Sequence, residues 1–75
     1  MTTEHNDTRA VEIGKSNAAM CVDQIDAYDS REAAFAAYMT NAGDTAIAEG
    51  LGDRGWQTAQ SMFVVEYNRL IGVEA

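Results

Sequence analysis

Four carboxylates stand three residues apart in the first half of the chain: Asp23, Asp26, Asp29 and Glu32. Carboxylates held in a pocket can do acid–base chemistry, whereas exposed ones can take the place of nucleic-acid phosphates against a basic protein. On a single helix such a series would drift by about 60° per step. We therefore expect Asp29 and Glu32 to cap a new helix, and Asp23 and Asp26 to line an exposed flank beside Glu12. The plain interpretation is a solvated surface, and the functional one is a phosphate-like patch.

The overall charge favours a basic partner. Twelve Asp and Glu residues against five Lys and Arg give a net charge of −7. Nucleic-acid binding normally needs the opposite sign, because phosphate contacts supply most of the affinity. Acidic composition is also typical of proteins that are merely soluble. We expect no direct contact with nucleic acid.

Residue types that support catalysis or metal binding are scarce. The only histidine, His5, lies in a polar, unpatterned start, and the only cysteine, Cys21, has apolar neighbours at helical intervals that favour burial. No spacing of Cys and His is typical of a metal site. We therefore expect no enzyme, no metal and no cofactor.

One stretch follows the pattern of a known motif. Its apolar, small, apolar and turn-glycine positions hold Ile47, Ala48, Leu51 and Gly52. With these residues the stretch 44–61 resembles the helix-turn-helix of DNA-binding regulators. The resemblance implies a recognition helix that reads DNA through Arg54, Gln57 and Gln60. Asp53 and Thr58 depart from the motif, which has apolar residues at both positions.

The element that must position these residues is predicted at 53–71. Its apolar residues fall within an arc of about 140° on a helical wheel: Trp56, Ala59, Phe63, Val64, Tyr67, Leu70 and Ile71. Asp53 can cap this helix and Gly72 can end it. We expect Trp56, Phe63, Tyr67 and Leu70 to be largely buried.

Two apolar residues of this helix, Met62 and Val65, lie outside the arc. Isolated exposed apolar residues are common and need no function. In a chain whose apolar residues are mostly alanine, they could instead form a homodimer contact or a ridge that binds a partner.

Two or three further helices are expected before it. An apolar repeat covers residues 8–28, although Gly14 weakens it enough that the helix could begin at Ser16 or Asn17. The capping box from Asp29 to Glu32 opens a helix at 30–40. The sequence Asn41-Ala42-Gly43 is expected to end it, and a short helix follows at 45–49.

The predicted fold is an all-α, single-domain bundle of three to four helices over residues 8–75, after a disordered tail at 1–7. The alternative is an α+β fold, because residues 62–67 are rich in β-formers and could be a short strand. No signal peptide and no run of about 18 apolar residues is present, so we expect a cytoplasmic protein that does not enter a membrane.

The composition predicts a small, non-enzymatic protein that binds and blocks a basic, nucleic-acid-binding surface of another protein. Small acidic inhibitors of this kind are typical of phages and mobile elements that act against host nucleases or CRISPR-type complexes. The candidate contact residues are Glu12, Asp23, Asp26, Asp29, Glu32, Met62 and Val65. Two alternatives are a DNA-binding regulator that uses residues 44–61, and an antitoxin-like or structural partner that masks an apolar surface.

Overall fold

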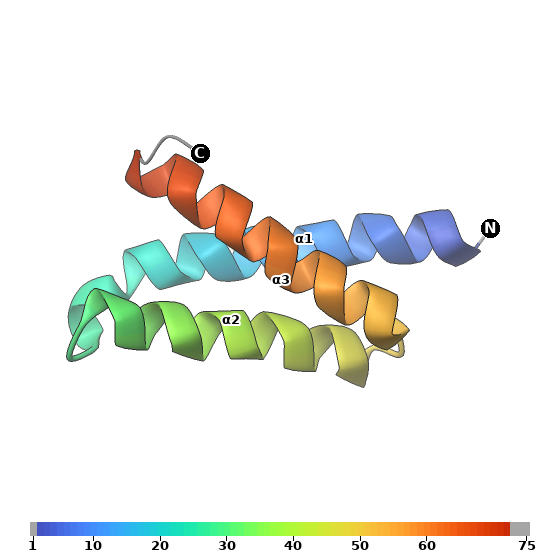
Figure 1. The fold of residues 1–75 in the computed structure, drawn as a ribbon, viewed down its shortest axis with the longest axis horizontal. Helices are drawn as coiled ribbons and strands as arrows, with labels where there is room; N and C mark the ends of the chain where they lie inside the picture. The colour runs from blue at the N-terminus through green and yellow to red at the C-terminus, as the bar shows by residue number, and fades with distance from the viewer. Residues whose placement is uncertain (1, 73–75) are drawn as a thin grey trace.

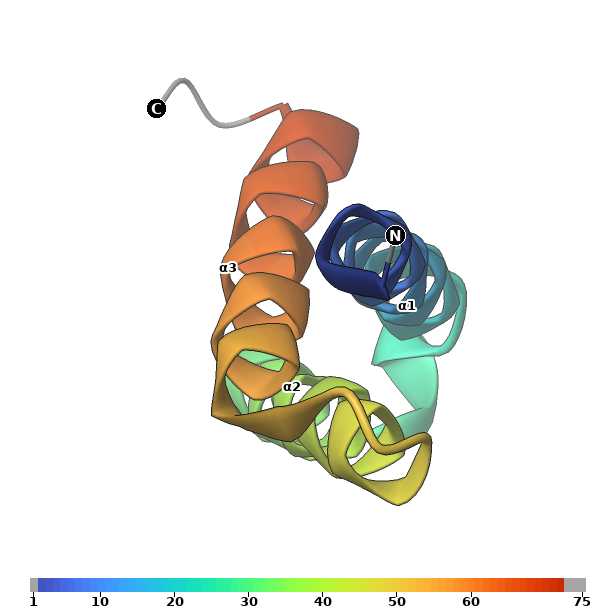
Figure 2. The same ribbon diagram turned by 90° about the vertical axis from the view of Figure 1, so that its right-hand side faces the viewer.

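The computed structural model describes the backbone of residues 2–72 and the side chains of residues 7–72. It contains helices α1 (Thr2–Asp23), α2 (Arg31–Ala48) and α3 (Gly52–Ile71), with a short 3₁₀ helix, η1 (Ile25–Ala27), between the first two. Helices α1 and α2 run side by side in opposite directions, and α3 crosses both of them obliquely (Figures 1 and 2). The predicted all-α bundle is confirmed. The alternative strand at 62–67 is wrong, since these residues lie within α3.

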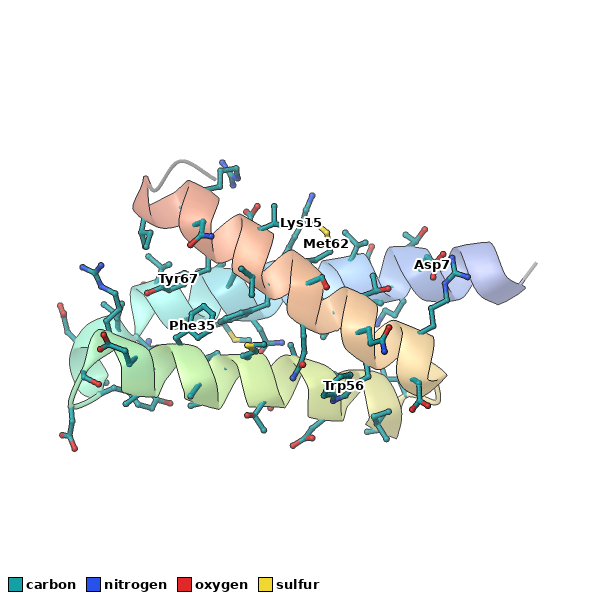
Figure 3. The ribbon with its side chains drawn as sticks, viewed as in Figure 1. Asp7, Lys15, Phe35, Trp56, Met62 and Tyr67 are labelled. Atoms are coloured by element: carbon teal, nitrogen blue, oxygen red, sulfur yellow. The ribbon has the colours of Figure 1, made fainter. Side chains whose placement is uncertain are left out.

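The amphipathic pattern placed α3 correctly. Phe63 and Tyr67 are buried, and Gly72 ends the helix with a left-handed φ of 84°. The first turn differs from the prediction, because Leu51 occupies the cap position and Asp53 lies inside the helix without capping it. A buried aromatic cluster joins the helices, since the ring centroid of Phe35 lies 5.1 Å from that of Phe63 and 5.0 Å from that of Tyr67, both edge-to-face (Figure 3).

Trp56 and Leu70 are each 39% exposed, so the prediction that both are largely buried is wrong. Helix α2 lies beneath Trp56, and no helix among the described residues covers its outer side. Leu70 belongs to the last turn of α3, which diverges from the other two helices (Figure 1).

Helix α1 is longer than the sequence suggested, because it begins at Thr2 and passes through Gly14 without a break. Residues 2–7 are thus helical, in place of the expected disordered tail; residue 1 lies outside the described residues. Asp7 is held by an ion pair with Arg54 of α3, at 2.8 Å. Asn17 does not cap a helix but lies buried inside α1, where its oxygen accepts a 2.6 Å hydrogen bond from Asn41 of α2.

Helix α2 also differs from its predicted bounds. The capping residue is Ser30, whose hydroxyl accepts a hydrogen bond from the amide of Ala33, so the predicted Asp29 cap is one residue too early. The helix then continues through Gly43, which was expected to end it. A Cβ on Gly43 would lie 2.5 Å from the indole nitrogen of Trp56, so this glycine gives α3 room to pack instead of stopping α2.

Candidate protein-interaction surfaces

The connection from α1 to α2 gathers four of the candidate carboxylates at one end of the molecule. Asp23 ends α1, Asp26 lies in η1, Asp29 precedes the α2 cap, and Glu32 lies in the first turn of α2; all four are exposed. We call this set the acidic turn. It occupies the cyan-to-green end of the ribbon in Figure 1.

Local contacts fix the shape of the acidic turn. The amide of Gln24 donates to the carbonyl of Met20, and the amide of Ala27 donates to the carbonyl of Gln24, each at 2.9 Å. The ring of Tyr28 then packs edge-on against Tyr38 of α2, with centroids 5.9 Å apart. The carboxylates are therefore carried by a hydrogen-bonded turn that is anchored to α2.

The acidic turn makes no ion pair within residues 7–72, unlike most of the other described carboxylates, although the exposed Arg31 adjoins it. Four carboxylates elsewhere make ion pairs: Glu12 and Glu49 with Arg9, Asp7 with Arg54, and Glu66 with Arg69. Within residues 7–72 no ion pair involves the four side chains of the acidic turn, and Asp23 accepts only an amide hydrogen from Gln24. Their negative charge is therefore free to meet an outside cation.

The ion pairs elsewhere have visible electrostatic effects. Arg9 donates two hydrogen bonds, of 2.6 and 2.7 Å, to the carboxylate of Glu49 and holds the pKa of that carboxyl below its usual range. Arg69 likewise lowers the pKa of the Glu66 carboxyl. These carboxylates are already neutralised within the molecule, which makes them weaker candidates for a partner contact.

Glu12 does not join the acidic turn. It lies eleven residues before Asp23 on the same helix, which corresponds to about 16 Å at a rise of 1.5 Å per residue. Its carboxylate is 3.5 Å from the guanidinium of Arg9. The expected flank of Glu12, Asp23 and Asp26 is thus two separate regions.

A shallow depression of about 330 Å³ opens beside the acidic turn. It is lined by Ile25, Asp26, Tyr28, Asp29, Ser30 and Arg31. Arg31 is the cation in this set, beside two carboxylates. The depression offers a Lys or Arg side chain of a partner both negative charge and an apolar wall.

Met62 and Val65 do not form one ridge. Met62 is partly buried and faces α1 at Gly14, where an added Cβ would lie 2.8 Å from the Cβ of Met62 (Figure 3). Val65 is 58% exposed. The structure therefore leaves Val65 available for contact and places Met62 largely in the α1–α3 interface.

The residues expected to read DNA in the helix-turn-helix alternative are mostly engaged within the molecule. Arg54 makes two hydrogen bonds to Asp7, of 3.0 and 2.8 Å. Gln60 donates to the carbonyl of Met39 at 3.1 Å. The side chain of Gln57 is exposed and makes no hydrogen bond with the residues that the structure describes, whereas Arg54 is exposed but paired. This arrangement favours a structural role for Arg54 and Gln60.

Groups able to do covalent or metal chemistry are few in the described part of the chain. Cys21 is buried, and burial raises the pKa of its thiol. No three His, Cys, Asp or Glu side chains among the described residues are placed to hold a metal ion. The buried hydroxyl of Tyr67 has no hydrogen-bond partner within residues 7–72. None of the described helices is long and apolar enough to cross a membrane.

Sequence reasoning missed a second surface, between α2 and α3. Ile47 and Trp56 are both substantially exposed there, and two shallow depressions adjoin the indole. The available signal was Gly43, because a glycine inside a helix can mark the close approach of a large side chain. A helical wheel reports only that Trp56 faces the other helices, and gives no sign of how much of it they cover.

Comparisons of the chain with protein-family models, with curated proteins and with solved structures find no match.

Proposed function

We propose that this protein works by binding, and that the acidic turn docks onto a basic, nucleic-acid-binding surface of another protein and keeps nucleic acid away from it. The observation that carries the proposal is the gathering, on one ordered turn, of four carboxylates that make no ion pair within residues 7–72. A host nuclease or a CRISPR-type defence complex has the kind of surface that such a turn would fit. The matching class of protein is the small inhibitors that phages and mobile elements produce against such host proteins.

The distribution of charge supports this orientation. Arg9, Arg54 and Arg69 neutralise carboxylates on α1, α3 and the end of α2, whereas the acidic turn keeps its charge. A partner with a basic groove would be steered toward this end of the molecule. Such attraction acts mainly on the association rate, and salt screens it over about 8–10 Å.

The test first needs a binding partner. The chain is immobilised and incubated with extracts of the source cell, and the protein that it retains is recovered for the measurements. Asp23→Asn/Asp26→Asn removes two charges from exposed residues that neither cap a helix nor fill the core. We expect its association rate with the recovered protein to fall several-fold, and the unmodified chain to release bound DNA from that protein.

The matched control is Glu12→Gln/Glu66→Gln, which removes the same charge from carboxylates that already pair with Arg9 and Arg69, away from the acidic turn. This control should bind nearly as fast as the unmodified chain, when both are measured by surface plasmon resonance at two salt concentrations. Equal loss in the two double variants, or binding that does not depend on salt, would contradict the proposal. Direct binding of DNA by the isolated chain would instead favour the regulator.

A further inference from the structure

Two adjoining depressions lie between α2 and α3. One, of about 220 Å³, is lined by Met39, Trp56, Gln57, Gln60, Ser61 and Val64. The other, of about 340 Å³, is lined by Ile47, Asp53, Trp56 and Gln57. Trp56 and Gln57 line both, so the two form one continuous surface with the indole at its centre. We call it the Trp56 groove; Trp56 is labelled between α2 and α3 in Figure 3.

The groove presents apolar area on a fixed floor. Ile47 is 49% exposed, although it belongs to the apolar set that a small domain would normally bury. The indole lies against Gly43, and the hydrogen bond from Gln60 to the carbonyl of Met39 ties α3 to α2 beside it. A half-exposed tryptophan on a rigid support is typical of the residues that dominate binding energy in protein interfaces.

Negative charge flanks this apolar surface. Asp53 lines one of the two depressions. Asp44 lies on α2 three residues before Ile47, so the side chains of Asp44 and Ile47 are neighbours on that helix. Both carboxylates are exposed, and neither makes an ion pair with the residues that the structure describes. The occupant must therefore combine an apolar stripe with Lys or Arg on its flanks.

The dimensions fit a short helix. The groove follows α2 from Met39 to Ile47 and α3 from Asp53 to Val64, which correspond to about 12 and 16 Å of helix. A segment of about ten helical residues has this length. A second copy of the chain is a poor occupant, because it carries a net charge of −7 and would bring like charge to the rim.

We propose that the Trp56 groove docks an amphipathic, basic α-helix of another protein, with its apolar stripe on Trp56 and Ile47 and its Lys or Arg residues beside Asp44 and Asp53. Helix-in-groove recognition places apolar residues at three- and four-residue intervals against such a surface. The groove lies apart from the acidic turn, so this inference stands whether or not the proposed function holds.

Trp56 is the only tryptophan, so its fluorescence reports on the groove directly. The probe is a synthetic Leu–Lys peptide of about 14 residues with a helical amphipathic pattern. We expect a saturable blue shift of the Trp56 emission as the peptide covers the indole. A Leu–Glu peptide of the same pattern, and a Leu–Lys peptide of the same composition in scrambled order, should leave the emission unchanged.

Two pairs of variants locate the binding. Ile47→Lys should weaken the affinity roughly tenfold or more, and Val65→Lys, with the same charge change on the exposed face of α3, should change it less than about twofold. Asp44→Asn/Asp53→Asn should weaken binding several-fold, whereas Glu12→Gln/Glu66→Gln, which removes the same charge from carboxylates that already pair with Arg9 and Arg69, should change it less than about twofold. Equal effects within either pair would show mere attraction to an acidic protein and would overturn the proposal. So would the absence of any shift, or a shift that follows protein concentration without peptide, which would show a second copy in the groove.

Discussion

Helix α3 meets its two neighbours in different ways, and a glycine inside each neighbour shows the difference. Gly14 of α1 lies against the backbone of α3, where an added Cβ would clash with the carbonyl of Ala59 and lie 2.8 Å from the amide nitrogen of Phe63. Gly43 of α2 lies against side chains, where an added Cβ would lie 2.5 Å from the indole of Trp56 and 2.9 Å from the amide of Gln60. One contact brings two backbones together, and the other accommodates a ring.

The two contacts have different consequences. Backbones in contact bury the small side chains around them, and Ala10, Ala18 and Ala59 are fully buried near the α1–α3 crossing. On the α2 side the indole separates the helices and remains partly exposed, which creates the Trp56 groove. The same helix thus forms a closed interface on one side and an open groove on the other.

The largest effect should come from Gly14→Ala. Alanine has the higher helix propensity, by about 1 kcal/mol. The added methyl meets backbone that cannot turn away, so the cost of overpacking should lie at the upper end of the usual range, at about 3 kcal/mol. We expect a net loss of about 2 kcal/mol, or a fall in Tm of roughly 8–16 °C for a domain of this size, by circular dichroism.

The control is Ala19→Gly, at an exposed position of the same helix, which should cost only about 1 kcal/mol of helix propensity. If Gly14→Ala instead raised the Tm, the close α1–α3 crossing would be refuted.

Gly43→Ala should have a smaller effect on stability. Its Cβ would meet the indole of Trp56 and the end of Gln60, and the partly exposed indole can move outward. The gain in helix propensity offsets this shift, so we expect a change within about 1 kcal/mol and a red shift of the Trp56 emission. A loss as large as that of Gly14→Ala would show that the α2–α3 contact is as rigid as the α1–α3 contact.

These two glycines also show why part of the fold could not be predicted from the sequence. The 3.6-residue spacing around Phe63 and Tyr67 predicted α3 and its buried face, because burial of a continuous apolar stripe depends on the segment itself. A glycine within such a pattern predicts a weak point or an end. A glycine can instead mark a point where two helices pack closely. That depends on the residues of the opposite helix, and the residues near the glycine in sequence do not specify them.

The candidate surfaces could likewise be predicted only where they depend on a single segment of the chain. The exposure of Asp23, Asp26, Asp29 and Glu32 could be predicted from their types and from the break between the helices. Their lack of ion pairs within residues 7–72 could not, because Arg9 and Arg54 pair with residues 40 and 47 positions away in sequence. The Trp56 groove was missed because its walls come from two helices and its indole was expected in the core.

The smallest effect concerns the remaining interface, where the ion pair of Arg9 with Glu49 joins α1 to the end of α2. This pair lowers the pKa of Glu49 in the folded protein, so its contribution is present above the ordinary carboxyl pKa and is lost as pH falls through the folded value. Arg9→Gln should therefore lower the Tm slightly at about pH 7, and the difference from the unmodified chain should shrink as the pH falls below the ordinary carboxyl pKa. The charge-matched control is Lys15→Gln, because Lys15 is exposed and no ion pair joins it to the described residues. Lys15 is the weakest of the influences that lower the pKa of the Glu66 carboxyl, so its Tm difference should follow this pH course much less than that of Arg9→Gln. An Arg9→Gln effect that does not change as the pH falls would show that Arg9 joins α1 to α2 by packing and not by its charge.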